Sequence, residues 1–401
     1  MKIPFNRPFL VGTEMEYVRE VCARGHLSGS GLFTQKCQAR IEARIGCRKA
    51  LLTQSGTAAL EMAAILANVQ PGDEVIMPSY TFVSTANAFV LRGATPVFVD
   101  IRADTLNIDE SSIERAITPR TRAIVVVHYA GVGCEMDRIM EIANRHGLLV
   151  IEDAAHGFGS KYRGRPLGSI GHLAAFSFHE TKNIHSGEGG ALLINDARFV
   201  ERAEVIWEKG TDRVKFARGE VSKYTWVDVG SSFLPSEITA AFLWAQLEAA
   251  DKIAAERLAV WERYDALFRL YSGECSFRVP FIPPQCAHNA HIYYLLLLTE
   301  ADRDHLIQRA ASRGIQIVIH YVPLHASKAG LRYARVSGEV TNTENAARRL
   351  ARLPLWIGMD EDSVADVSSS LLKPVSVVSP AILGGSPKTR HVVDAPAGNR
   401  S

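Results

Sequence analysis

The chain has 401 residues, a length at which two or three structural units are expected. Its composition, 47% hydrophobic and 22% charged, is typical of a globular protein and excludes a collagen-like or wholly disordered chain. The 45 Lys and Arg residues nearly balance the 43 Asp and Glu residues. This balance gives no support to a nucleic-acid-binding protein or to a polybasic membrane anchor.

Cysteine usage and apolar segments predict a cytoplasmic protein. The six cysteines are scattered, form no CxxC pair and lack zinc-ligand spacing, so neither a disulfide framework nor a metal site is expected. No apolar run approaches the ~20 residues that a membrane-spanning helix needs. The first residues also lack the apolar centre of a signal peptide.

Short apolar runs alternate with helical patterns through the first half of the chain. Strands are expected at residues 75–77, 96–100, 123–128, 148–153, 174–179 and 190–194, and helices at 57–68 and 136–146. Most of these strands are largely apolar, as strands are when helices cover both faces of a sheet. The β-α-β-α order predicts an α/β fold with a mostly parallel central sheet.

The pattern changes after about residue 235. One long helix is expected over residues 236–268, and a loop with several prolines follows it. Beyond the loop, strands are expected at residues 292–298 and 315–319, with a helix at 302–313 between them. These elements indicate a second, smaller α+β unit.

The predicted organisation is therefore a large cofactor-binding domain and a small C-terminal domain. We place the large domain at residues 1–250 and the small domain at residues 251–373. Residues 374–401 are rich in Pro, Ser, Gly and Val without a period, and we expect a poorly ordered tail there.

The first candidate for chemistry is a turn of small residues at 53–60, which opens directly into a helix. Free backbone N–H groups and the helix dipole at such an end suit a phosphate. The alternative is an ordinary helix cap, in which Ser55 or Thr57 satisfies the first turn. Taken alone, this segment favours the cap.

Two charged side chains come near the ends of predicted strands. Asp153 ends the strand at 148–153 and either caps the next helix or pairs with a buried cation. Lys182 lies in the polar loop after the strand at 174–179. A loop lysine is most often a solvated charge. In a partly buried cleft, however, its pKa falls and its amine can bond to a carbonyl carbon.

Phe82 is the fourth feature, and it either packs in the core or stacks on a flat ring. A phosphate cradle, an apolar platform, a carboxylate and a lysine together match the needs of pyridoxal phosphate (PLP). Its phosphate must be held, its aldehyde bound by lysine, and its ring nitrogen kept protonated. The HExxH, GxSxG and GxGxxG signatures of other enzyme classes are not found in the sequence.

These motifs stand in an order that resembles the DegT/DnrJ/EryC1/StrS family of sugar-nucleotide aminotransferases. The resemblance is carried by SGTAAL (55–60), PSYTFVST (78–85), EDAAH (152–156), FSFHETKN (176–183) and GEGG (187–190). It continues through HYVPLH (320–325) and LPL (353–355), and it spans about residues 3 to 373. Residues 77–89, 223–226, 230–232 and 244–248 resemble most the members that form dTDP-4-amino-4,6-dideoxygalactose.

The resemblance implies a type I PLP-dependent aminotransferase fold and a homodimer whose subunits share their active sites. It implies that Lys182 is the catalytic residue, which holds the cofactor covalently and later moves the substrate proton. Asp153 would pair with the pyridinium nitrogen, and His156 would lie near the 3′-oxygen. The remaining implied cofactor contacts are the phosphate ligands Gly56, Thr57, Ala58 and Ser177 and the stacking residue Phe82.

Two sets of residues are assigned less directly. Many relatives carry Tyr-Asn after the position of Gly230, and that Asn reaches the phosphate across the dimer. Here Ser231 and Ser232 replace the pair, and Ser232 can still donate one hydrogen bond. A group of three residues, His320, Tyr321 and His325, either contacts the sugar nucleotide or the carboxylate of the donor, or is structural.

The activity implied is transfer of an amino group from an amino acid, L-glutamate, to C4 of a dTDP-4-keto-6-deoxyhexose, with galacto configuration in the product. One alternative is an aminotransferase for a different nucleotide sugar. Another is a PLP-dependent sugar-nucleotide dehydratase, but such relatives replace the lysine with His, so Lys182 argues against it. A non-catalytic partner-binding protein on the same scaffold is disfavoured by the presence of both Asp153 and Lys182.

Overall fold

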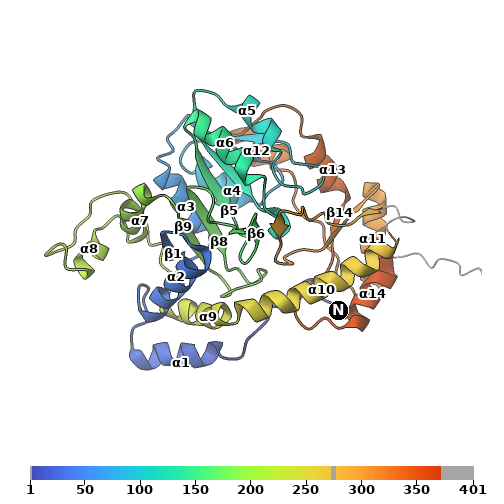
Figure 1. The fold of residues 1–401 in the computed structure, drawn as a ribbon, viewed down its shortest axis with the longest axis horizontal. Helices are drawn as coiled ribbons and strands as arrows, with labels where there is room; N and C mark the ends of the chain where they lie inside the picture. Colours follow the sequence, from blue (N-terminus) through green and yellow to red (C-terminus); the bar gives the residue numbers. More distant parts are fainter. Residues whose placement is uncertain (1, 272–276, 372–401) are drawn as a thin grey trace, which may run out of the picture.

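The computed structural model describes residues 2–271 and 277–371 and is organised around an eight-stranded sheet (Figure 1). The tail predicted at residues 374–401 lies outside the described residues. In spatial order the strands are β1 (Lys49–Thr53), β9 (Gly190–Ile194), β8 (Leu173–Ser177), β5 (Leu149–Asp153), β4 (Thr121–Val127), β2 (Glu74–Pro78), β3 (Thr95–Val99) and β13 (Arg335–Val336). Only β9 runs antiparallel to its neighbours β1 and β8 within this sheet. The predicted α/β fold with a mostly parallel sheet is confirmed.

Side chains of each strand alternate between two apolar layers. In β1, Leu51 packs in one layer, whereas Ala50 and Leu52 pack in the other. The first layer is covered by α3 (Gly56–Leu66), α4 (Val83–Val90) and α7 (Val200–Trp207). The second is covered by α2 (Leu32–Ile45), α5 (Ile113–Ala116), α6 (Met136–His146) and α9 (Glu237–Glu248). Helices on both faces explain why the strands are apolar nearly throughout.

The long helix expected over residues 236–268 is two helices. The chain forms α9 up to Glu248 and α10 (Ala250–Tyr271) after it, with a bend at Ala249. Both helices pack on the same core around this bend, since Leu243 of α9 and Ile253 of α10 lie over the central sheet. Farther along, Tyr264 of α10 reaches the core of the second unit. No proline or glycine marks the bend in the sequence.

The second unit is built on a three-stranded sheet of β10 (Phe277–Arg278), β12 (Tyr294–Leu297) and β14 (Leu350–Arg352). Its helices are α11 (Glu300–Ser312), α12 (Lys328–Tyr333), α13 (Thr341–Arg349) and α14 (Glu361–Leu371). The strand predicted at residues 315–319 is wrong, because this segment makes only single bridges, from Ile315 to Ile3 and from Val318 to Arg352. Each neighbouring segment forms a single β-bridge with it, and one bridge does not make a β-strand.

The division into residues 1–250 and 251–373 remains a proposal, and several contacts cross it. Near the start of the chain, Ile3 packs in the core of the second unit beside Trp261. In the opposite direction, β13 pairs with β3 in the central sheet. These contacts tie the two units together at the edge of the sheet.

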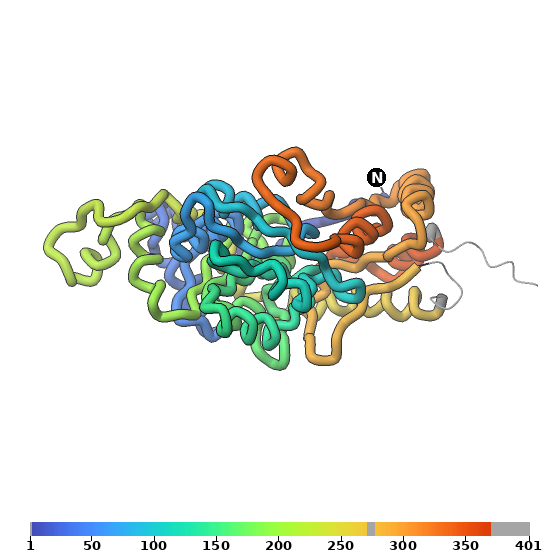
Figure 2. Tube along the Cα trace, turned by 90° about the horizontal axis from the view of Figure 1, so that it is seen from above, coloured from blue at the N-terminus to red at the C-terminus, as the bar shows by residue number. Residues whose placement is uncertain are grey.

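Three peripheral features complete the fold: helix α1, a small sheet and the region around helix α8. Helix α1 (Glu14–Arg24) packs on α9, and a small sheet of β11 (Cys286–Ala287), β6 (Lys161–Tyr162) and β7 (Arg165–Pro166) joins the two units. Helix α8 (Arg213–Ala217) and its flanking loops project from the end of the molecule opposite α11 and α14 (Figures 1 and 2). Short 3₁₀ turns lie at Glu110–Ser112, Tyr129–Gly131, Ala197–Phe199 and Leu324–Ala326.

Within residues 2–271 and 277–371, no helix combines the length and apolar character needed to cross a membrane.

Candidate active site

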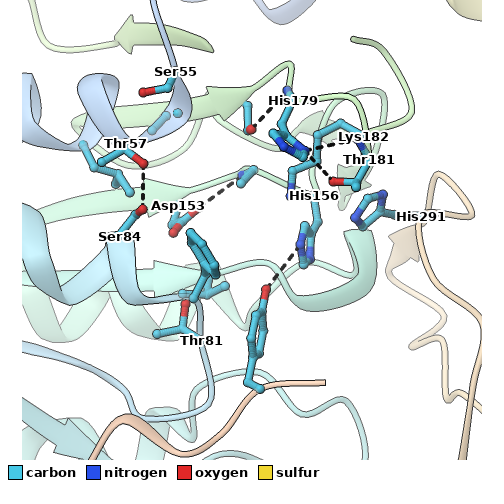
Figure 3. A pocket seen from close by; sticks show the side chains of 18 of the residues that line it. Ser55, Thr57, Thr81, Ser84, Asp153, His156, His179, Thr181, Lys182 and His291 are labelled. Carbon is cyan, nitrogen blue, oxygen red and sulfur yellow. Dashed lines mark hydrogen bonds between the residues drawn. The ribbon is translucent and has the colours of Figure 1, made fainter. Parts of the chain in front are cut away.

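A cavity of about 570 Å³ opens where β5 and β8 end and α3 begins (Figure 3). Asp153, Lys182 and Phe82 line it from the central sheet side. His320 and Arg352 line it from the second unit. The volume lies in the range of pockets that hold cofactor-sized molecules, and its position at the carboxyl ends of parallel strands is the usual one in open α/β sheets.

Asp153 is buried at the end of β5 and is held by a short hydrogen-bond chain. The hydroxyl of Thr85 donates to Oδ2 at 2.6 Å, and Thr81 and Thr85 share a hydrogen bond of 2.7 Å. The backbone N–H of Ala155 donates to Oδ1 at 3.2 Å. Burial nevertheless raises the pKa of Asp153, so the carboxylate is best stabilised by a cation brought into the cavity.

Lys182 lies half-buried in the loop between β8 and β9. Its backbone N–H donates to the carbonyl of His179 at 2.8 Å, and the N–H of Glu180 donates to the carbonyl of Gly187 at 2.8 Å. Gly187 has a φ of 77°, a backbone conformation that favours glycine in this tight loop. Burial lowers the pKa of Lys182 from 10.5 to about 8, although the charge of Asp153 opposes the shift. The amine therefore loses its proton at a much lower pH than an ordinary lysine does.

The start of α3 forms the candidate phosphate site. Gly56, Thr57 and Ser177 line the cavity there, and the hydroxyl of Thr57 shares a hydrogen bond of 2.6 Å with Ser84. Gly56 approaches β8 so closely that an added Cβ would lie 2.9 Å from Cβ of Ser177. Ala58 does not line the cavity, because its N–H donates to the capping hydroxyl of Ser55 at 3.1 Å. The segment is therefore a capped helix start whose other free N–H groups and dipole suit an anion.

Aromatic rings and histidines form the facing wall. The rings of His156 and His291 lie 4.2 Å apart, and those of His320 and Tyr321 lie 3.7 Å apart. The hydroxyl of Tyr321 meets Nε2 of His156 at 3.4 Å. Burial holds the pKa of each of the three histidines well below 6.5, so all three are neutral at pH 7.

Two asparagines connect this wall to the loop of Lys182. Asn183 donates to the carbonyl of Asn289 at 2.7 Å, and its Oδ1 meets Nδ1 of His291 at 2.9 Å. Asn289 in turn donates to the carbonyl of His156 at 2.7 Å. The residue that follows Lys182 thus fixes the position of His291.

Phe82 and two further predicted residues lie at the margin of the cavity or outside it. Phe82 is 57% exposed on the cavity wall, and no protein ring stacks on it within the described ranges. Ser232 is exposed and does not line the cavity, and its carbonyl accepts a hydrogen bond from Gln54. His325 also lies outside the lining, with its Nδ1 2.8 Å from the hydroxyl of Ser79.

Several lining residues are not among the predicted site residues, including Ser84, His179, His291 and Arg352. Ser84 belongs to a quoted motif, and its place in the first turn of α4 was the available signal. His291 and Arg352 carry no local pattern that points to a site. Among the residues that the structure describes, no group of three or more His, Cys, Asp or Glu side chains is placed to hold a metal ion.

The chain is similar to known proteins in both sequence and fold. The sequence profile of the DegT/DnrJ/EryC1/StrS aminotransferase family matches residues 9–372. The chain is 34% identical over 373 residues to the spore coat polysaccharide biosynthesis protein SpsC of Bacillus subtilis, covering 91% of this chain and 95% of SpsC. The fold is similar to the aminotransferase TlmJ from Streptoalloteichus hindustanus, with a TM-score of 0.84, 29% identity, and coverage of 92% and 97% of the two chains. It is also similar to the PLP form of Spr1654 from Streptococcus pneumoniae, with a TM-score of 0.83, 25% identity, and coverage of 92% and 100%.

Proposed function

This chain belongs to the DegT/DnrJ/EryC1/StrS aminotransferase family, and we propose that it transfers an amino group from L-glutamate to C4 of a dTDP-4-keto-6-deoxyhexose. The product would be a dTDP-4-amino-4,6-dideoxyhexose of galacto configuration. The observation that carries the proposal is the convergence of Asp153, Lys182 and the start of α3 on one cavity. The name of the relative SpsC supports a sugar substrate and a role in polysaccharide biosynthesis. We place the reaction in the cytoplasm, as the sequence analysis predicts.

The cofactor of the family is PLP, and the residues of the cavity fit it. Asp153 is a buried carboxylate whose raised pKa calls for a cation, and it would bind the ring nitrogen. Nδ1 of His156 is buried without a hydrogen-bond partner on the cavity wall, and it would bind the 3′-oxygen. Gly56, Thr57 and Ser177 would hold the phosphate at the positive end of α3.

When bound, the cofactor supplies an aldehyde carbon that receives the nitrogen and a ring that accepts the electron pair of the substrate C–H bond. Asp153 would keep the ring nitrogen protonated. Lys182, with a pKa of about 8, would take the proton from the α-carbon of the donor, and in the second half-reaction it would return a proton to C4 of the sugar. A positioned acid and base of this kind contributes about 10²–10⁴-fold to the rate.

The facing wall would orient the substrate and exclude water. His320 is fixed by a hydrogen bond of 2.7 Å to the hydroxyl of the buried Tyr129. Tyr321 stacks on His320 and reaches His156, so these rings form one rigid surface. Neutral rings leave the charge of Lys182 undisturbed by a neighbouring imidazolium.

We further propose a homodimer with shared active sites. The projecting arm around α8 exposes large apolar side chains, including Trp226 at 78% and Tyr224 at 44%, while Phe82 is 57% exposed on the cavity wall. Exposed apolar surfaces of this kind typically mark an interface. A second copy would bury the arm and bring Ser232 near the phosphate of the partner. Analytical ultracentrifugation should find a dimer that the double variant Trp226→Asp, Tyr224→Asp dissociates; a monomeric wild type would contradict this.

The proposed activity is tested by offering the holoenzyme L-glutamate with a panel of keto-sugar nucleotides. Mass and NMR should identify a product with a new amine at C4 of the dTDP-linked hexose, together with 2-oxoglutarate. An amine on another sugar nucleotide would correct the substrate. A deoxygenated product without nitrogen transfer would replace the proposal with the dehydratase alternative.

A further inference from the structure

Arg352 is a cation without an anionic partner on the wall of the cavity. It is the last residue of β14, and its backbone is bonded to Val318 at 2.8 and 3.2 Å. Its Nε is buried and has no hydrogen-bond partner, and within residues 2–271 and 277–371 no carboxylate pairs with its guanidinium. Its Cζ lies 4.8 Å from the centroid of the Phe5 ring. A largely desolvated charge without a partner is costly, so the position calls for an anion from outside the chain.

The carboxylates of the cavity do not meet this need. Asp153 is engaged by Thr85 and by the N–H of Ala155, on the sheet side. Glu188 has a side chain that is 71% exposed, and it faces His179 at 3.7 Å. The other buried arginine nearby, Arg257, differs because it donates to the carbonyls of Ala290 and His291 at 3.1 Å each.

The placement of Arg352 favours one substrate anion over another. Arg352 lines the same cavity as Lys182, His156 and His320, and its positive charge lowers the pKa of each of them. It therefore lies near the reacting amine. The α-carboxylate of an amino donor is attached to the carbon that carries the transferred nitrogen, so it must lie beside Lys182. The diphosphate of a sugar nucleotide is attached at C1, across the hexose ring from C4.

We propose that Arg352 binds the α-carboxylate of the amino donor. The planar guanidinium can donate two parallel hydrogen bonds to one carboxylate, which would also fix the angle of the donor against Lys182. This inference rests on the proposed aminotransferase function and adds the residue that selects an amino acid as donor.

The test measures binding without turnover. 2-Oxoglutarate has no amino group to give to the holoenzyme, and its affinity can be measured by calorimetry for the wild type and for Arg352→Gln. We expect the Kd to rise about 10–100-fold, because charge-assisted bonds to the carboxylate are lost. The Kd of dTDP should stay within about twofold, since the nucleotide does not contact Arg352 in this proposal.

Matched variants and probes sharpen the result. Arg352→Lys keeps the charge but not the planar fork, and it should recover part of the affinity. Arg349→Gln removes a cation of α13 that donates to the carbonyls of Asn345 and Leu298 and does not line the cavity, and it should bind 2-oxoglutarate as the wild type does. 2-Oxovalerate keeps only the carboxylate beside its carbonyl, and its Kd should rise in Arg352→Gln by the same factor.

The contrary outcomes are distinct. An unchanged Kd for 2-oxoglutarate in Arg352→Gln, while the wild type still uses glutamate, overturns this inference alone. A loss confined to dTDP assigns Arg352 to the diphosphate, and a loss for 2-oxoglutarate but not for 2-oxovalerate assigns it to the γ-carboxylate; either contradicts the proposal. A wild type that accepts no amino donor removes the proposed function and the inference together.

Discussion

The wall of the cavity formed by the central sheet and the wall formed by the second unit carry different kinds of polar group. On the sheet side, Asp153 is held by a threonine pair and Lys182 by a hydrogen-bonded loop. On the other side, His320 and Tyr321 are stacked neutral rings, and Arg352 is a cation that no carboxylate of the described residues pairs with. The side chains of the sheet wall are held in place by hydrogen bonds within the chain, which suits a cofactor that stays bound. The wall of the second unit keeps the positive charge of Arg352, which an anionic substrate can neutralise when it binds.

The largest expected effect comes from removing the amine of the sheet wall. Lys182→Ala should lower amino transfer by about 10³-fold or more, because the group that moves the proton is lost. Product formation followed by mass spectrometry measures this. Lys161→Ala, an exposed lysine of β6, should keep wild-type activity. A Lys182→Ala protein of undiminished activity would show that Lys182 does not transfer the proton.

The carboxylate of the same wall should matter next. Asp153→Asn keeps the size of the side chain and an acceptor for Thr85 but removes the charge, and it should lower turnover by about 10²-fold. The exposed Asp362→Asn serves as the control.

The cofactor-free Asp153→Asn protein should show the opposite effect on stability. Burial raises the pKa of Asp153 above its ordinary value of 3.8, so above that value the ionised group destabilises the folded state, and the penalty is relieved as the pH falls. At pH 7 the cofactor-free variant should therefore melt at a higher temperature than the cofactor-free wild type. A lower melting temperature would show that the charge is already compensated within the chain.

A third prediction concerns the hydrogen bonds that join the second unit to the central sheet, which we expect to stabilise the fold. Arg335 of β13 donates to the buried Glu74 at 3.0 and 2.7 Å. Arg335→Ala should lower the free energy of unfolding by about 1–3 kcal/mol, because it removes a charge-assisted pair of hydrogen bonds. Urea unfolding measures this, with the exposed Arg332→Ala as control.

The contribution of Glu74 should also depend on pH in a defined window. Its bonds to Arg335 are the main cause that lowers its pKa from 4.5 to about 2. A carboxylate with a lowered pKa stabilises the fold fully above pH 4.5, and the contribution is lost as the pH falls towards 2. The difference between the wild type and Arg335→Ala should shrink across that window, and a constant difference would contradict the assignment.

The smallest effect concerns the pKa of Lys182, on which the two walls act in opposite directions. In the cofactor-free wild type, reductive methylation of Lys182 should be half-maximal near pH 8. Asp153 raises this pKa and Arg352 lowers it, so Asp153→Asn should shift the midpoint down and Arg352→Gln should shift it up. Mass spectrometry of the modified peptide measures each midpoint. Shifts of the same sign would show that the two charges do not have opposing effects on the pKa of Lys182.

Much of the sheet wall could be predicted from the sequence because its signals are local. Asp153, Lys182 and Phe82 each come after a short apolar run that forms a strand, and the ends of parallel strands meet at one edge. The helix start at Gly56 is marked by the small residues before it. Strand identity and spacing therefore place these residues together without knowledge of distant contacts.

The second wall depends on contacts between distant parts of the chain, which a single sequence does not display. His291 is held at the cavity by a hydrogen bond with Asn183, which also donates to the carbonyl of Asn289, 106 positions away in sequence. Arg352 is placed by the pairing of β14 with β12 and by a bridge to Val318. The bend at Ala249 likewise has no proline or glycine in the sequence to mark it.

The most direct test of the central claim is to locate the cofactor on the chain. Borohydride reduction of the holoenzyme fixes any bond between the cofactor and a lysine, and digestion with mass spectrometry then identifies the modified peptide. The account predicts that the phosphopyridoxyl group lies on Lys182, in the peptide that continues into Asn183 and Ile184. Modification of a different lysine, or recovery of an unmodified Lys182 from a preparation saturated with PLP, would contradict it.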